Sequence, residues 1–494
     1  MGGARLDRRR FLGLATAALA GAACRGADDP VARSGSSTSA STTTPPYRLD
    51  PDVPYWLQGN YAPVSEEVEA FDLAVTGSLP AGLNGLYVRN GSNPATGSSP
   101  HWFLGDGMVH GVRLEAGNAR WYRNRYVDTP LYRTRREFGD LDAGAPGTQN
   151  SQSNVSVFEH QGRLLSSGEV GWPYALDPTD LSTEGATDLR GPAGALGANF
   201  TAHPKVDPET GELHAFGYGF VAPYLTYYRI GVDGTLVQSE QIEVAGPTMM
   251  HDFAITDREA VFWEFPVVFD LDAALEGTGF PFVWTPDYGS RVGVLPFGAP
   301  GTDIRWVEIP NQMVFHGTNA YRDGDEIVLD VNVQASAFDP AGDPPGSVLH
   351  RWRIDTSGEV LSFRDEQLAD RWMDFPRIDP RQTGRPHGRA WYVDFTDTED
   401  EGMLFRGITG VSGGREVTAW RPHEAEHAGE VTFVSDPERG NGGGWLLGFV
   451  YDRRTDASSL VVLDPDDLVA GPVARVELPQ RVPFGFHGTW VPAV

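Results

Sequence analysis

Four histidines are the residues of this chain whose type and setting could hold a metal ion. They are His203 in Phe-Thr-Ala-His-Pro-Lys, His251 in Met-Met-His-Asp-Phe, His316 in Val-Phe-His-Gly-Thr-Asn and His487 in Phe-Gly-Phe-His-Gly-Thr-Trp. Neutral imidazole is the commonest metal ligand in proteins. A site made only of imidazoles suits iron, zinc or copper, whereas magnesium and calcium prefer oxygen ligands.

A site of this kind needs carboxylates close behind its ligands, because imidazoles do not neutralise a divalent cation. A carboxylate that accepts the second ring N–H of a ligating histidine fixes the tautomer and supplies negative charge. Three acids stand in apolar runs, where an unpaired carboxylate is costly. They are Glu169, Asp374 and Glu430. The alternative for each is an ordinary acid in a loop or on an edge strand.

The elements that could bring the four histidines together are β-strands. From about Leu57 onward, short β-rich runs alternate with Gly, Pro, Asp and Asn turns, which indicates an all-β sandwich, barrel or propeller. The histidines are 48, 65 and 171 residues apart. Propeller blades take roughly 40–50 residues and more with long loops, so this spacing favours one histidine per blade with some blades skipped. Helical periodicity is weak and confined to residues 270–276 and 365–370.

The charge composition of the chain limits the classes of partner that it could bind. The formal net charge of the 494 residues is −28. That acidity disfavours nucleic acid as a partner, because phosphate binding needs a basic footprint, and it disfavours electrostatic docking on anionic lipid. Lys205 is the only lysine, which we interpret first as a composition bias of the source.

The N-terminus predicts export. Residues 1–24 combine Asp-Arg-Arg-Arg-Phe-Leu with a short apolar run, which resembles a twin-arginine signal for already folded proteins. Cys24 is the only cysteine, and it is either a lipidation site, which would allow peripheral membrane contact, or a leader residue lost on cleavage. Residues 25–46 are polar and of low complexity and predict a disordered tether. Residues 47–494 are then one extracytoplasmic domain.

Several motifs resemble those of the carotenoid cleavage oxygenase family, and they follow in the family's order. They stand at residues 86–94, 101–110, 122–127, 174–178, 202–205, 375–381, 445–452 and 483–488. The resemblance covers nearly the whole chain after the tether. It implies a seven-bladed β-propeller with a cap of loops and short helices over an Fe²⁺ ion on the axis.

Site residues carry over from the family by motif. The iron ligands correspond to His203, His251, His316 and His487, and the family's three glutamates behind them correspond to Glu169, Asp374 and Glu430. Asp374 is one methylene shorter, so we expect its bond to an imidazole, that of His316, to be longer or bridged by water. Ser153 precedes Asn154 where the family often has threonine or valine, so we expect a missing methyl group near the open metal position.

The activity that the resemblance implies is dioxygenase cleavage of a conjugated carbon–carbon double bond into two carbonyl products. An aromatic tunnel would hold the apolar substrate. Its candidates are Trp102, Phe103, Tyr126, Trp263, Phe265, Phe269, Phe282 and Trp284, and ordinary β core is the alternative for each.

Three readings of the substrate and role stay open. Carotenoids or apocarotenoids are the family's usual substrates. Stilbenes or phenylpropenes suit an exported enzyme, and relatives that cleave stilbenes hold the phenol with a tyrosine and a lysine. Tyr126 could be that tyrosine, but no lysine precedes Asn154. A non-catalytic secreted propeller that only binds ligands is a reading of another class.

Overall fold

The computed structural model describes residues 49–136, 150–276, 280–340, 346–398, 402–440 and 442–493. The predicted export signal and tether lie outside these residues. Among the described residues, no helix is both long and apolar enough to span a bilayer.

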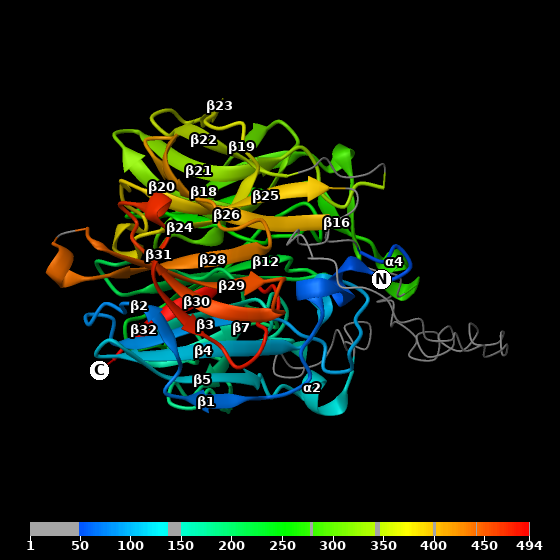
Figure 1. Cartoon of the computed structure of the whole chain (residues 1–494). Helices are drawn as coiled ribbons and strands as arrows, with labels where there is room; N and C mark the ends of the chain where they lie inside the picture. Colours follow the sequence, from blue (N-terminus) through cyan, green and yellow to red (C-terminus); the bar gives the residue numbers. More distant parts are fainter. Residues whose placement is uncertain are drawn as a thin grey trace, which may run out of the picture.

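Seven antiparallel sheets of four or five strands follow one another along the chain and form the blades of a propeller (Figure 1). Innermost strands of neighbouring blades contact one another, as β28 (Glu426–Ser435) does with β24 (Met373–Ile378) and β32 (Gly488–Pro492). The predicted all-β, seven-bladed architecture is therefore confirmed. In sheet order, blade 1 is β1 (Glu69–Phe71), β5 (Asn118–Tyr126), β4 (Gly107–Glu115), β3 (Gly85–Ser92) and β32 (Gly488–Pro492); blade 2 is β6 (Ser156–His160), β7 (Arg163–Ser167), β8 (Tyr174–Leu176) and β9 (Thr183–Ala186); blade 3 is β10 (Lys205–Val206), β11 (Leu213–Tyr218), β12 (Leu225–Ile230) and β13 (Leu236–Ile242); blade 4 is β14 (Ala254–Ile255), β15 (Glu259–Glu264), β18 (Ser290–Pro296) and β19 (Arg305–Ile309).

The remaining blades continue the pattern, and a small hairpin stands apart from them. Blade 5 is β20 (Met313–Asp323), β21 (Glu326–Gln334), β22 (Val348–Asp355) and β23 (Ser362–Gln367); blade 6 is β24 (Met373–Ile378), β25 (Ala390–Thr398), β26 (Gly402–Ser412) and β27 (Arg415–Trp420); blade 7 is β2 (Val75–Gly77), β31 (Pro472–Glu477), β30 (Ala457–Leu463), β29 (Gly444–Asp452) and β28 (Glu426–Ser435); the hairpin is β16 (Val267–Phe269) with β17 (Phe282–Trp284).

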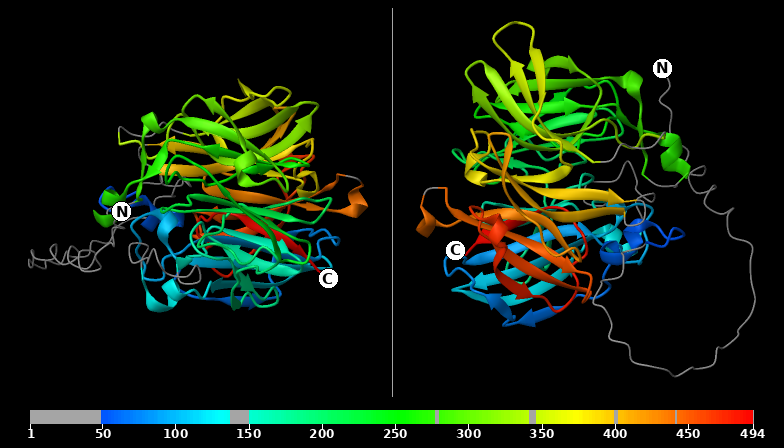
Figure 2. Two further views of the ribbon diagram at one scale, coloured as in Figure 1. Left: turned by 180° about the vertical axis from the view of Figure 1, so that it is seen from behind. Right: turned by 45° about the horizontal axis from the view of Figure 1, so that its top comes forward.

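The ring is closed by strands from opposite ends of the chain. β32, the last strand, pairs antiparallel with β3, so that Arg89 faces Gly488 and Gly85 faces Pro492. The early strand β2 pairs with β31 at the outer edge of blade 7. Figure 2 shows the blue and red ends of the chain side by side. These pairings leave blades 1 and 7 joined through both termini of the folded chain.

Short helices supply part of the cap that covers one end of the propeller. Helices α2 (Pro130–Thr134) and α4 (Leu271–Glu276) lie beyond the strand ends at the right of Figure 1. The 3-10 turn η3 (Trp102–Leu104) lies over the axial site described below. Helix α4 agrees with the weak helical pattern at 270–276. The predicted helix at 365–370 is wrong, because residues 365–367 belong to the exposed edge strand β23 and residues 368–370 form no helix.

The core lies between the faces of adjacent blades. The largest apolar cluster joins blades 3, 4 and 5 and contains the fully buried rings of Trp263, Phe262 and Trp352. Burying one large apolar side chain contributes about 1.5–3 kcal/mol. The strands near the axis are therefore held by packing on both sides, and they offer a rigid frame for polar side chains that point into the channel.

Candidate metal centre

The four predicted histidines meet on the axis of the propeller. His203 lies two residues before β10 of blade 3, and His251 lies three residues before β14 of blade 4. His316 lies in β20 of blade 5, and His487 directly precedes β32 of blade 1. One nitrogen of each ring lies within 4.8 Å of the others. The Nε2 atom of His251 is 3.0 Å from that of His203 and 3.3 Å from that of His316.

These nitrogen spacings suit one shared metal ion. Metal–imidazole bonds of about 2.0–2.1 Å at right angles would place two neighbouring nitrogens about 3 Å apart. Because the donor set is all imidazole, it suits iron, zinc or copper and not magnesium or calcium. The described geometry thus fits a transition-metal site of four histidine ligands.

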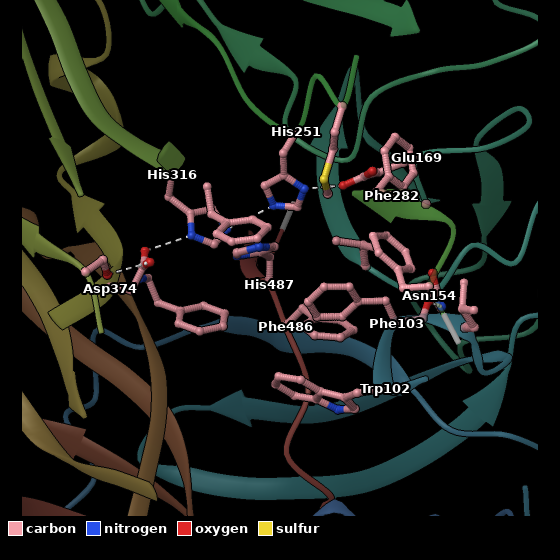
Figure 3. Close-up of a pocket in the computed structure, with 18 of the residues that line it drawn as sticks. Trp102, Phe103, Asn154, Glu169, His251, Phe282, His316, Asp374, Phe486 and His487 are labelled. Carbon is pink, nitrogen blue, oxygen red and sulfur yellow. Dashed lines mark hydrogen bonds and ion pairs between the residues drawn. The ribbon is translucent and has the colours of Figure 1, made fainter. Parts of the chain in front are cut away.

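Three of the four rings are oriented by a carboxylate, and Figure 3 shows two of these contacts, those of His251 with Glu169 and of His316 with Asp374. Nδ1 of His251 contacts Glu169, Nδ1 of His316 is 2.8 Å from Asp374 Oδ1, and Nδ1 of His487 is 2.8 Å from Glu430 Oε1. Each acid accepts the Nδ1 proton, which leaves the lone pair of Nε2 free to point toward the common centre.

His203 is the exception, because no carboxylate contacts its ring among the described residues. Burial, with the three other histidines and Lys205, holds the pKa of His203 well below its usual value. Burial also lowers the pKa of His487 to about 4, against the opposing effect of Glu430. Both rings are therefore neutral near pH 7, which is the form that binds a metal.

Asp374 reaches His316 directly, so the expected longer or water-bridged contact is wrong. Its 2.8 Å distance equals that of the longer Glu430 to His487. The backbone compensates for the missing methylene, because the register of β24 shifts after Asp374 and Phe375 adopts a left-handed φ of 53°. The Ser347 hydroxyl lies 3.0 Å from Oδ2 of Asp374 and 2.8 Å from the Met373 carbonyl, so its single proton is shared between these two acceptors.

Irregular strand pairing recurs at the site residues. The β20–β21 register shifts between Val314 and Gly317, across His316, and again after Gly317. The β28–β29 register shifts between Ala428 and Val431, across Glu430. A β-bulge bends a strand and re-aims a side chain. In all three inner strands that carry a site residue, the irregularity turns that residue toward the axis.

The carboxylates are balanced by different neighbours. Tyr218 donates its hydroxyl proton to Glu169, and Arg377 lies 2.7 Å from Glu430 Oε2. Burial raises the pKa of Glu430, but Arg377 and His487 lower it by more, to about 2. In formal charges, the three carboxylates and Arg377 together carry −2. A divalent cation would neutralise that charge.

An apolar cavity of about 240 Å³ opens beside the histidines. His251, His316 and His487 line it, and His203 does not. Of the predicted tunnel residues, Trp102, Phe103 and Phe282 lie on its wall (Figure 3). Sequence reasoning missed further aromatic residues there, namely Tyr218, Phe220, Phe280, Phe315, Trp372, Phe375, Phe395 and Phe486.

The other tunnel predictions are wrong for this cavity. The Tyr126 hydroxyl accepts from Asn93 Nδ2 at 2.6 Å and donates to the Val64 carbonyl. Phe265 packs in the core against Trp352. Trp263, Phe269 and Trp284 are likewise absent from the lining.

Ser153 does not line the cavity, so the structure does not support the expected missing methyl group beside the metal. Its backbone has a left-handed φ of 49°, and its Oγ is 2.8 Å from Ser166 Oγ, away from the cavity. Val155, two residues on, lines the cavity and supplies branched methyl groups there. The Val155 carbonyl accepts from the His487 backbone N–H at 3.0 Å, so this side chain is fixed relative to a ligand.

Comparisons with known proteins agree with this geometry. The family model described as Retinal pigment epithelial membrane protein matches residues 61–492. The carotenoid cleavage oxygenase of Mycobacterium tuberculosis is 37% identical over 506 residues, covering 88% of this chain and 97% of that protein. The isoeugenol monooxygenase of Pseudomonas putida is 32% identical over 470 residues, covering 88% and 97%. The crystal structure of Pseudomonas brassicacearum lignostilbene dioxygenase matches with a TM-score of 0.80 at 29% identity, over 91% of this chain and 100% of that one.

Proposed function

The chain belongs to the family of the retinal pigment epithelial membrane protein, the carotenoid oxygenases, and from this premise we propose that it is an iron(II)-dependent dioxygenase. It cleaves one conjugated carbon–carbon double bond with O₂, and each new carbonyl group receives one of the two oxygen atoms. The observation that carries the proposal is the convergence of four histidines at the end of an aromatic cavity. When bound there, iron(II) supplies the redox chemistry that activates O₂.

The protein's own contribution is placement of the substrate. Phe103, Phe282 and Phe486 are among the flat rings that face the cavity, and they suit a planar conjugated chain. An apolar wall binds such a chain and excludes water, while the fixed position of the rings selects the double bond that lies beside the metal. No side chain is needed for proton transfer, because the reaction of an alkene with O₂ to two carbonyl products moves no proton.

The substrate class that we propose is a carotenoid or apocarotenoid. The similar isoeugenol and lignostilbene enzymes keep phenylpropenes and stilbenes as the second candidate. Against this second candidate, neither Tyr126 nor Lys205, the residues considered for holding a phenol, lines the cavity. Tyr126 is bonded away from the cavity, and Lys205 is paired with Asp252 and is not part of the cavity wall.

A substrate panel under ¹⁸O₂ tests the proposal. Protein loaded anaerobically with one Fe²⁺ is given an apocarotenoid, isoeugenol and a hydroxystilbene, and the products are identified by mass. We expect cleavage of the apocarotenoid with one ¹⁸O in each aldehyde. Cleavage of the phenolic alkenes alone would transfer the assignment to the second candidate. Iron-loaded protein that consumes no O₂ with any of the three would instead support the non-catalytic binding module.

We also propose that the protein works outside the cytoplasm, on the basis of residues 1–24 alone. Replacing Arg8 and Arg9 by lysine should retain the folded protein in the cytoplasm, because twin-arginine export depends on that pair. Cell fractionation checks the result. Normal export of the double variant would contradict this route.

A further inference from the structure

Lys205 is the one lysine among the chain's 39 basic residues, and it stands beside the metal centre. It begins β10, two residues after His203. The bias toward arginine explains the other positions and leaves this one unexplained. A specific contact that an ammonium group makes better than a guanidinium group would explain why lysine is present here.

The contact is a buried ion pair with Asp252. Lys205 Nζ lies 2.8 Å from Asp252 Oδ1, and only 1% of the Asp252 side chain is exposed. Asp252 Oδ2 accepts the backbone N–H of Gly317 at 2.9 Å, and Oδ1 accepts that of Phe253 at 2.8 Å. Both oxygens of this carboxylate are therefore engaged.

The ion pair joins three ligand-bearing segments. Lys205 follows His203 in blade 3, Asp252 is adjacent to His251 in blade 4, and Gly317 is adjacent to His316 in blade 5. One carboxylate thus fixes the relative positions of three consecutive blades within two residues of a ligand in each.

The fourth ligand is held by a similar arrangement. Glu430 Oε2 accepts the backbone N–H of Gly488, next to His487, at 2.9 Å and also pairs with Arg377. Both glycines come from the repeated Phe-His-Gly-Thr sequence. In each copy, the N–H that follows the ligand donates to a buried carboxylate, and a partly exposed cation pairs with that carboxylate. The repeated motif is therefore a repeated local structure.

We propose that Lys205 and Asp252 are positioning residues that set the spacing of His203, His251 and His316 and thereby the affinity and geometry of the bound metal. The inference rests on the proposed metal site and not on the identity of the substrate. The ammonium is a compact point charge, whereas a guanidinium is a larger planar fork, so the two are not interchangeable at a contact this close to three ligand segments.

Cobalt(II) binding without substrate tests the proposal. Lys205→Met removes the charge and keeps an unbranched side chain. The matched control is Arg291→Met, which removes the cation from the Arg291–Glu264 pair. That pair is 2.6 Å long with 25% and 2% of the side chains exposed, against 21% and 1% for Lys205 and Asp252. We expect Lys205→Met to lower Co²⁺ affinity about 10- to 100-fold and to change the visible absorption spectrum of bound Co²⁺. Arg291→Met should leave both unchanged.

Lys205→Arg completes the test, because it keeps the charge and the fold. We expect it to recover part of the affinity lost in Lys205→Met while KM for the substrate stays at the native value. Native affinity and an unchanged spectrum in both Lys205 variants would overturn the proposal. Wild-type protein that binds no Co²⁺ would instead remove the metal site itself, so the two failures are distinguishable.

Discussion

Each acid at the metal centre has a partner of its own, because a carboxylate can orient a histidine ring only if its own position is fixed. Glu169 is held by Tyr218, Asp374 by Ser347 and Glu430 by Arg377. These three partners, which we call the outer groups, differ in charge and length although the three acids have the same role. Substitutions of the outer groups should therefore weaken metal binding without removing any ligand.

Tyr218→Phe isolates one outer group, since it deletes a hydroxyl and keeps the ring in the cavity wall. We expect metal affinity to fall about 10-fold or more, because Glu169 loses a donor and holds His251 less firmly. Metal titration followed by fluorescence measures it. Tyr126→Phe is the control, because it loses hydroxyl contacts to neutral groups, worth about 0.5–1.5 kcal/mol, away from the metal. Equal metal affinities in the two variants would contradict the role of Tyr218.

Asp374→Glu tests how closely the backbone is fitted to the shorter acid. The extra methylene must enter a position where Asp374 already contacts His316 at 2.8 Å and Ser347 at 3.0 Å. We expect the free energy of unfolding to fall by about 1–3 kcal/mol, as in other overpacked sites, and metal affinity to fall with it. Denaturant unfolding and Co²⁺ titration give the two values. A variant with the wild-type free energy of unfolding and the wild-type Co²⁺ affinity would show that the site accommodates either acid.

The sequence predicted the site residues unequally well. Histidines and acids inside apolar runs are costly unless they are used, so His316 and Glu430 could be recognised. Aromatic residues carry no such signal, because β core and tunnel wall use the same side chains. Phe265 was therefore wrongly assigned to the tunnel and Phe280 was missed. Ser153 was misplaced because a left-handed φ is invisible in the sequence.

Strands position the site through their irregularities rather than through their regular pairing. Shifts of register accompany His316 in β20, Asp374 in β24 and Glu430 in β28. Alternation of apolar and polar residues predicts a strand but not a bulge within it. For the same reason, the charged run in β23 could be mistaken for a helix, since charges on an edge strand obscure its period of two.

Gly317→Ala tests one such irregular segment. A Cβ atom at Gly317 would lie 2.8 Å from Cη2 of the buried Trp263, so β20 or the indole must shift. We expect a loss of about 1–3 kcal/mol in the free energy of unfolding and weaker metal binding, because His316 is the preceding residue. Gly388→Ala is the control, since a Cβ there meets nothing within 4 Å. Unfolding curves that coincide for the two variants would contradict this prediction.

The stability of the whole molecule depends on the burial of apolar side chains, because its single cysteine allows no internal disulfide. The seven-bladed ring could be predicted from histidine spacing together with family resemblance. The pairing of β32 with β3 and of β2 with β31 could not, because a strand's partner is set by its three-dimensional neighbours and leaves no local pattern.

Burial also makes the stability of the whole molecule depend on pH. Desolvation lowers the pKa of His101 to about 4, of His214 to about 3 and of His427 to about 4. The unfolded chain, with histidine pKa values near 6.5, binds more protons than the native state below that pH. Stability should therefore fall from pH 7 toward pH 4, by roughly 1.4 kcal/mol per histidine per pH unit over that window. Urea unfolding at pH 7.5 and 5.5 checks the sign, and equal or greater stability at pH 5.5 would contradict it.

The position of His487, immediately before the strand that closes the ring, also sets the order of events during synthesis. His487 is synthesised 171 residues after His316, so three of the four ligands leave the ribosome well before the fourth. A complete metal site can form only after β32 has emerged and paired with β3. Loading of the metal is therefore coupled to closure of the ring.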